Sequence, residues 1–236
     1  MVYIKKLKME NNNLELYLIR HGESEINHLM DHTPKEDKIL AGATFWAQLS
    51  PDGIEQSRAL GRYLRQQKIV FDKIVVSPCV RTQQTLRYSM EEFLDYDNLC
   101  LALSTVEIAM DLREHYQGIW EGRLKREIDY DNYVATVSTD PEKFWQTRFP
   151  GGESPKEVGT RIADYLEKNI LGKGFSRVGL YTHRGAITWI LHHLFKTPIP
   201  VLFANGKGTP PASIAKVYFD SRQPLRYELN AFIPTD

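Results

Sequence analysis

The feature that most constrains this chain is an apolar, strand-like run that ends directly in a cation, an imidazole and a glycine. From Leu14 to Ile19 the residues first alternate and then become continuously apolar, which is typical of a strand buried in a sheet. In an open α/β sheet, ligands bind outside the carboxyl ends of the strands, so we expect Arg20 and His21 to lie at the mouth of a site. Gly22 leaves room for the backbone to turn and to approach a ligand.

An arginine next to a histidine is a combination that suits an anionic ligand. The guanidinium of Arg20 is a fixed planar cation that can bind phosphate or carboxylate through two parallel hydrogen bonds. The imidazole of His21 adds a titratable nitrogen beside it. An isolated pair of this kind is more often a structural ion pair beside a turn. The choice between these interpretations depends on the rest of the chain.

A second strand-like run leads to the same kind of residue. Residues 71–76 are predicted to form a strand, and residues 80–94 are predicted to form the helix that follows it. Arg81 then lies in the first turn of this helix, where free backbone N–H groups also favour an anion. Alone it would be an ordinary surface arginine. Because two strand tips each offer an arginine, Arg20 and Arg81 together predict a shared anion site.

The same arrangement recurs near the end of the chain. A strand predicted over residues 176–181 is followed by His183 and Gly185, and then by a helix predicted over residues 186–195. A single further histidine would most often be structural. At the tip of a second strand, however, His183 is predicted to enter the pocket opposite His21.

The remaining segments complete an α/β pattern. Ser50 and Pro51 have the residue types that cap and begin a helix, and Ser154 starts another. Further predicted elements are an irregular segment at 24–50, a strand at 101–110, two short helices within 124–148, and a final hairpin of edge strands at 217–219 and 227–229. Strands that alternate with helices predict one α/β domain over residues 1–236 with a mostly parallel sheet. We expect residues 1–13 to be a leader and residues 123–149 to be a lid insertion.

The composition argues against several classes of partner. Thirty basic and thirty acidic residues leave no net charge, so nothing points to a nucleic acid, and no apolar run is long enough to cross a membrane. The N-terminal residues lack the continuous apolar region of a signal peptide. Two cysteines are too few for a disulfide framework, and free thiols favour a cytoplasmic protein, although the two could form one disulfide. The sequence gives no oligomeric state.

Some polar residues have simpler interpretations than catalysis. His28 and His32 are four residues apart, but no helix is predicted there. No carboxylate or cysteine partner completes a metal site with them, so no metal is predicted. Arg161 is expected to lie in solvent. His192 and His193 are expected to lie in solvent or to complement the dipole at the end of their helix.

The first strand tip, Leu18–Ser24, resembles the Arg-His-Gly signature of the histidine phosphatase superfamily, the phosphoglycerate mutase-like enzymes. Four further segments occur in the order expected for that family. They are Ser77–Thr85, Leu112–Glu114 with Gly118–Gly122, Phe149–Ser154 and Tyr181–Gly185. Together they span the chain from residue 14 to about residue 186. The resemblance implies a three-layer αβα fold with a mostly parallel central sheet and the strand neighbours of that family.

The resemblance also implies a chemical role for each residue of the predicted site. Arg20, Arg81 and His183 would clamp a phosphoryl group by its oxygens. His21 would attack phosphorus and become phosphohistidine. Glu114 would protonate the departing alkoxide and later take a proton from water.

Further positions follow from the same resemblance. Asn27 and Gly185 are expected to contact the substrate. Arg184 stands where relatives often have glycine, so a third cation is expected at the rim. Glu121 competes with Glu114 as the acid, but its place in a Trp-Glu-Gly turn favours a structural role.

The predicted function is hydrolysis of a small phosphorylated metabolite, or of another phosphomonoester, without a metal or other cofactor. The Pro-Gly-Gly-Glu-Ser segment resembles the phosphatase branches of the family. Mutase relatives carry an Arg-Arg pair and a longer basic segment, whereas residues 124–148 contain Arg126 and Arg148 but no such pair. The first alternative is a 2,3-bisphosphoglycerate-dependent phosphoglycerate mutase. The second and weaker alternative is a non-catalytic protein that binds a phosphorylated ligand. The sequence does not give the substrate, because specificity resides in the divergent loop and lid.

Overall fold

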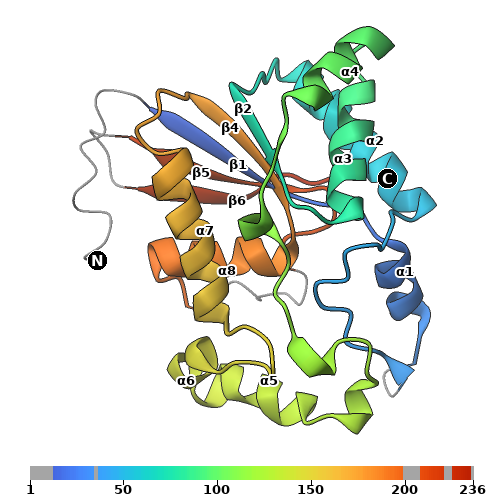
Figure 1. Ribbon diagram of the computed structural model, residues 1–236, viewed down its shortest axis with the longest axis vertical. Helices are drawn as coiled ribbons and strands as arrows, with labels where there is room; N and C mark the ends of the chain where they lie inside the picture. Colours follow the sequence, from blue (N-terminus) through green and yellow to red (C-terminus); the bar gives the residue numbers. More distant parts are fainter. Residues whose placement is uncertain (1–12, 35–36, 199–207, 221–224, 235–236) are drawn as a thin grey trace.

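The computed structural model describes residues 13–34, 37–198, 208–220 and 225–234, and its central element is a six-stranded mixed sheet (Figure 1). The strands are β1 (Leu14–Arg20), β2 (Lys73–Val76), β3 (Glu107–Ile108), β4 (Arg177–Thr182), β5 (Ile214–Phe219) and β6 (Arg226–Phe232). Their order is β3-β2-β4-β1-β5-β6, with the first four parallel and the last two antiparallel to their neighbours. The predicted mostly parallel sheet is confirmed. The predicted leader lies, apart from its last residue, outside the described residues.

Helices cover both faces of this sheet (Figure 1). They are α1 (Glu25–His32), α2 (Pro51–Gln66), α3 (Val80–Glu91), α4 (Tyr96–Ser104), α5 (Tyr130–Thr139), α6 (Pro141–Gln146), α7 (Pro155–Asn169) and α8 (Arg184–Phe195). In β1, Leu16 and Leu18 pack with α7 and α8, whereas Tyr17 and Ile19 pack with α2 and α3. This alternation is the two-residue period of a strand buried on both faces, and it produces the three-layer arrangement. In the described part of the chain, no helix is long and apolar enough to cross a membrane.

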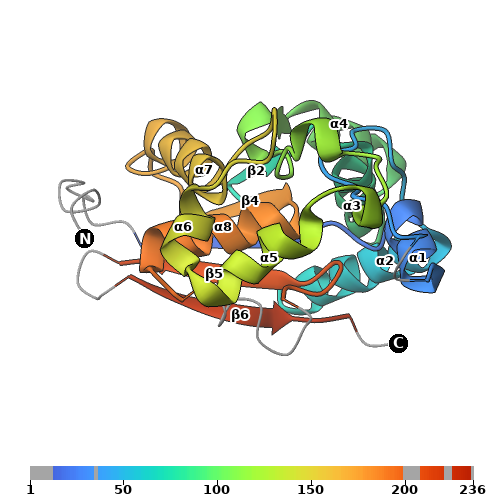
Figure 2. The same ribbon diagram turned by 90° about the horizontal axis from the view of Figure 1, so that it is seen from below.

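The predicted lid segment contains the two expected short helices, α5 and α6, which lie together at one end of the molecule (Figures 1 and 2). Tyr133, Phe144 and Trp145 are buried in the same core as α7 and α8. The ring centroid of Phe144 lies 5.9 Å from that of Trp189 on α8. Aromatic packing therefore joins this segment to the main fold.

The strand predicted over residues 101–110 is wrong for most of its length. Residues 96–104 form α4, and only Glu107 and Ile108 form a strand. Asp95 caps the helix by accepting a hydrogen bond from the backbone N–H of Asn98 at 2.9 Å. Leu99 and Leu103 then pack against the core beneath α2 and α3. A short apolar run suits either a strand or a helix, and the helix is selected by its cap and by this packing.

The segment over residues 24–50, predicted to be irregular, contains α1. Ser24 and Asn27 form a reciprocal cap, in which the backbone N–H of Asn27 donates to Ser24 Oγ at 3.2 Å. None of the helix residues is buried. Ile26, Leu29 and Met30 do have helical spacing, but this pattern covers only two turns and is embedded in a polar segment, so the helix was missed.

Two smaller expectations also need correction. The terminal hairpin is present, but β5 pairs with β1 and lies inside the sheet, so of these two strands only β6 is at an edge. His192 and His193 are half-buried instead of solvated, and burial lowers the pKa of both. The ring of His192 packs edge-on against Trp145, with centroids 4.4 Å apart.

Candidate active site

The register of the parallel strands brings two histidines together. Arg20 at the end of β1 pairs with Thr182 at the end of β4. The next residues, His21 and His183, therefore leave the sheet side by side, and the backbone N–H of His21 donates to the carbonyl of Thr182 at 3.0 Å. Their ring centroids are 5.1 Å apart. Both side chains are buried at the carboxyl edge of the sheet, where the sequence placed them.

The tautomer of His21 follows from its neighbours. Its Nδ1 lies 2.6 Å from the carbonyl oxygen of Gly22, which can only accept, so Nδ1 carries the proton. The lone pair is then on Nε2, where it accepts a hydrogen bond from Nε of Arg81 at 3.3 Å. Burial, together with the charges of Arg81 and Arg20, holds the pKa of His21 well below its usual range. His21 is therefore a neutral imidazole whose nucleophilic electron pair, on Nε2, is directed at Arg81.

The two arginines are buried cations that have no carboxylate partner in the described part of the chain. Arg20 and Arg81 are 8% and 5% exposed, and neither forms an ion pair with any residue in the described ranges. Arg20 Nη1 donates to the carbonyl of Thr209 at 2.6 Å, and Arg81 Nη1 donates to that of Thr44. Burial lowers the pKa of Arg20 to about 9. Buried charges are normally paired, so this pair favours an anionic ligand.

His183 adds a third donor to the pocket. Its Nε2 lies 2.8 Å from Oγ of Ser77, which itself accepts a hydrogen bond from the backbone N–H of Cys79 at 3.4 Å. The hydroxyl proton of Ser77 can then point at Nε2, which leaves the ring proton on Nδ1. This buried Nδ1 has no hydrogen-bond partner among the described residues. Burial and the charge of Arg81 also hold the pKa of His183 well below its usual range.

Glu114 reaches the same pocket from the loop after β3. The hydroxyl of Thr182 donates to the carbonyl of Leu112 at 2.6 Å, which fixes this loop against the tip of β4. The carboxylate of Glu114 then accepts hydrogen bonds at 3.2 Å from the backbone N–H groups of Gly185 and Ala186. The carboxylate thus lies at the N-terminus of α8, the helix that begins directly after His183.

Glu121 has a different environment. Its Oε1 accepts hydrogen bonds from the backbone N–H groups of Ala43 and Gln117, both at 2.8 Å. The carboxylate therefore joins the loop that supplies Thr44 to the turn that follows Glu114. This geometry agrees with the structural role expected for Glu121.

Three residues predicted to contact or admit a ligand also take part in contacts within the fold. Gly185 gives its N–H to Glu114, and the side-chain oxygen of Asn27 accepts a hydrogen bond from Ser24 Oγ at 2.8 Å. Only the amide nitrogen of Asn27 is left for a ligand. Gly22 was expected to approach a ligand, but a Cβ there would overlap the carbonyl of Gly53 on α2. Its missing side chain serves close packing of the backbone.

Arg184 is the exposed cation at the rim. It begins α8 and follows His183 directly, yet its side chain is exposed. Its guanidinium forms no hydrogen bond or ion pair with the residues that the structure describes. Its positive charge contributes to lowering the pKa of both Arg20 and His21, so it acts on the pocket.

Arg161 is the site residue that sequence reasoning missed. It was expected in solvent, but its side chain is 12% exposed and pairs with Glu153, with Nε and Oε1 2.9 Å apart. Its Nη2 donates to the carbonyl of Glu114 at 3.2 Å. The sequence held a signal for this, because Arg161 lies three residues after Val158 and four before Tyr165, both core residues of α7.

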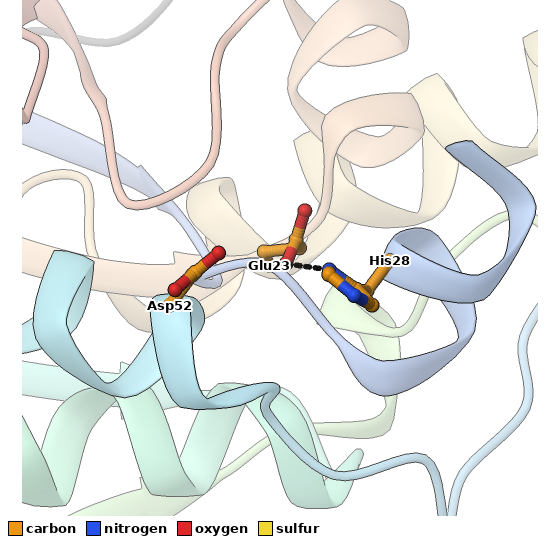
Figure 3. A group of neighbouring side chains, drawn as sticks. All are labelled: Glu23, His28 and Asp52. Atoms are coloured by element: carbon orange, nitrogen blue, oxygen red, sulfur yellow. Dashed lines mark hydrogen bonds and ion pairs between the residues drawn. The ribbon is translucent and has the colours of Figure 1, made fainter. Parts of the chain in front are cut away.

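Among the residues that the structure describes, one set of side chains could approach a metal ion. Glu23, His28 and Asp52 each place a ligand atom within 4.8 Å of the others (Figure 3). The carboxylate of Glu23 already accepts a hydrogen bond from Ser50 Oγ at 2.6 Å and lies 3.2 Å from His28 Nδ1. His28 and Asp52 are exposed. Because exposed acidic groups gather without a metal, this set carries no step of the chemistry.

Comparison with known proteins shows sequence similarity to phosphatases and to phosphoglycerate mutases. The sequence family described as the histidine phosphatase superfamily (branch 1) matches residues 16–231. A broad-specificity phosphatase of Saccharomyces cerevisiae is 30% identical over 193 residues, which are 78% of this chain and 72% of the yeast protein. A 2,3-bisphosphoglycerate-dependent phosphoglycerate mutase of Parvibaculum lavamentivorans is 27% identical over 191 residues, which are 77% of this chain and 80% of the mutase.

Solved structures with a similar fold include a phosphatase. The α-ribazole phosphatase of Shigella flexneri superposes with a TM-score of 0.68 at 21% sequence identity. The superposition covers 94% of this chain and 100% of that one. At this identity the similarity supports the fold alone.

Proposed function

This chain belongs to the histidine phosphatase superfamily, and we propose that it hydrolyses small phosphomonoesters through a phosphohistidine on His21. The observation that carries this proposal is the Nε2 lone pair of His21, which faces Arg81 in a pocket that also contains Arg20 and His183. A neutral nucleophile among buried donors suits an anionic electrophile.

In the first step the pocket would bind the phosphoryl group by its oxygens. Nε of Arg20 and Nδ1 of His183 are buried donors without partners in the described ranges, so both are free for this purpose. The guanidinium of Arg81 would turn its Nε–H from His21 to the phosphate. The fixed cations would then stabilise the charge that develops on the transferring group. Because they supply this charge, we propose that no metal is required.

Attack by Nε2 of His21 would form the N–P bond while the bond from phosphorus to the ester oxygen breaks. The ring keeps its Nδ1 proton, which the carbonyl of Gly22 holds. Glu114 would give a proton to the departing alkoxide. Water would then attack the phosphohistidine, lose a proton to Glu114 and release orthophosphate, which restores both residues.

A mutase would return the phosphoryl group to a sugar acid instead of to water. A mutase relative of similar coverage makes this the second candidate. We favour hydrolysis because the lid segment lacks the Arg-Arg pair of the mutases, and the Pro150-Gly151-Gly152 turn resembles the phosphatase branches. The natural substrate is proposed only as a small phosphorylated metabolite or other phosphomonoester.

The test combines a substrate screen with capture of the intermediate. The purified protein is incubated with a panel of phosphomonoesters in EDTA, and released phosphate is measured. Rapid quenching of a reaction with ³²P-labelled substrate in alkaline detergent should give a protein label that is stable in alkali and lost in acid, and His21→Ala should abolish it. An acid-stable label, or turnover retained in His21→Ala, would contradict the proposal. Conversion of 3-phosphoglycerate to 2-phosphoglycerate faster than release of phosphate from any ester would favour the mutase.

A further inference from the structure

Arg161 is a buried cation that the proposed reaction does not use. Its Nη1 donates to the carbonyl of Asp111, and its Nη2 donates to the carbonyls of Arg113 and Glu114 at 3.0 and 3.2 Å. One guanidinium thus binds three carbonyl groups in the turn that carries Glu114. The planar fork of arginine makes this possible, and the single ammonium of lysine could not span the same groups.

The partner of this cation is Glu153, from the turn before α7. Its carboxylate accepts from Arg161 Nε at 2.9 Å and from Arg161 Nη2 at 3.2 Å. It also accepts from Nη2 of Arg113 at 2.6 Å and from the backbone N–H of Tyr116 at 3.1 Å. The residues on both sides of Glu114 are therefore bound to one carboxylate.

The residue that follows the acid is held by the same turn. Nε2 of His115 donates to the carbonyl of Glu153 at 2.8 Å, and Nδ1 of His115 accepts from the indole of Trp189 at 3.2 Å. The backbone N–H of Glu153 donates to the carbonyl of Tyr116 at 2.8 Å. The loop of Glu114 is thus anchored from α7 on one side and from α8 on the other.

We propose that Arg161 and Glu153 are positioning residues that hold Glu114 where it can protonate the leaving group. The inference rests on the proposed function, because it takes Glu114 as the acid. Buried ion pairs contribute little net stability, since desolvation offsets their attraction. The pair instead fixes the conformation of the turn that carries Glu114, through charge-assisted and bidentate hydrogen bonds. The charge of Arg161 also reaches the pocket, where it contributes to lowering the pKa of His183.

The consequence is a defect that depends on the leaving group. An alkoxide leaves slowly unless it is protonated, whereas p-nitrophenolate leaves readily without a proton. If the pair only stabilised the fold, both kinds of ester would be affected in parallel. A misplaced acid should damage only the alkyl ester, because the nucleophile and the cations of the pocket stay in place.

The experiment uses Arg161→Gln in the full chain, with Arg148→Gln as the matched control. Arg148 also contacts this turn and pairs with a glutamate of α7, but its side chain is 63% exposed. In Arg161→Gln we expect kcat for an alkyl phosphate to fall by at least about 10-fold, toward the roughly 10²–10⁴-fold loss expected when a general acid is removed, while kcat for p-nitrophenyl phosphate changes less than about 3-fold. The alkaline limb of the alkyl-ester pH profile should also move. Arg148→Gln should change none of these.

Equal loss of turnover on both esters would overturn the inference. If Arg161→Gln does not fold, Arg161→Lys keeps the charge but not the fork, and it should show the same selective defect. Failure of both variants to fold would also overturn it, because the pair would then be an element of stability. Glu114→Gln in the same assay separates the two proposals. If that variant lacks the selective defect, the acid assignment fails, and if only Arg161→Gln lacks it, the positioning role fails.

Discussion

Gly185 and Glu114 lie so close together that a Cβ on residue 185 would overlap Oε1 of the carboxylate. The N–H of Gly185 donates to the other oxygen, Oε2, at 3.2 Å. The absent side chain is therefore what allows the carboxylate to reach the N-terminus of α8. A glycine that follows the second histidine thus serves the proposed acid.

We expect Gly185→Ala to fold and to lose activity selectively, toward alkyl phosphates more than toward p-nitrophenyl phosphate. The overlapping atom is the end of a flexible side chain, so the carboxylate moves aside at little cost to stability. Turnover of an alkyl phosphate should fall by about 10-fold or more, toward the range for loss of a general acid, with p-nitrophenyl phosphate affected less. Thermal unfolding and the two kinetic assays measure this. Gly53→Ala is the contrasting variant, because its Cβ would overlap the backbone carbonyl of Glu23 and should lower the melting temperature.

Replacement of Glu114 by Gln removes the proton donor itself. Loss of a general acid costs on the order of 10²–10⁴-fold, so hydrolysis of an alkyl phosphate should fall by this factor and p-nitrophenyl phosphate cleavage far less. The alkaline limb of the alkyl-ester pH profile should flatten, because that limb reports loss of the acid's proton. Glu121→Gln should do neither, since Gln Oε1 can still accept from Ala43 and Gln117. If Glu121→Gln showed the selective loss and Glu114→Gln did not, Glu121 would be the general acid.

Arg184→Gln tests the exposed cation at the rim. Its charge lowers the pKa of His21, so its removal should raise that pKa and move the acid limb of kcat/KM to higher pH, because His21 must be neutral to attack. The KM for 3-phosphoglycerate should rise by about two- to five-fold relative to that for p-nitrophenyl phosphate, as an exposed charge pair allows. Arg126→Gln, another exposed cation that pairs with Asp37, is the control. An unchanged ratio of KM values together with an unmoved acid limb would show that Arg184 does not act on the site.

The stability of the protein should fall in acid, partly through His115. Burial lowers the pKa of His115, whereas the unfolded chain has the ordinary value near 6.5. Below that value the unfolded state binds more protons, so the contribution of His115 is complete above about pH 6.5 and is lost as pH falls toward the folded pKa, by at most about 1.4 kcal/mol per pH unit. In His115→Gln, which can still donate to Glu153, the decrease in unfolding free energy between pH 7.5 and 5.5 should be smaller. An equal decrease in both proteins would exclude this contribution.

The sequence by itself determined the places where chemistry is presented. A buried apolar run followed by a polar tip is a local pattern, so the ends of β1, β2 and β4 could be found without a structure. The same holds for the helices that begin at Pro51 and Pro155, whose caps are formed by the residues just before them. These features depend on residues that are close in the sequence, and they are present in the structure as predicted.

Only the tertiary structure decided which groups meet. The pairing of Arg20 with Thr182 places His21 beside His183, although the two are 162 positions apart in the sequence. Burial of Arg161 beneath the loop of Glu114 depends on the packing of α7, and a charged residue in an apolar stripe was therefore assigned to solvent. The assignments at α1 and α4 failed for related reasons, since α1 is short and has no fully buried residue, and α4 takes its form from its cap and the core below. Long-range contacts select among conformations that the local sequence leaves nearly equal in free energy.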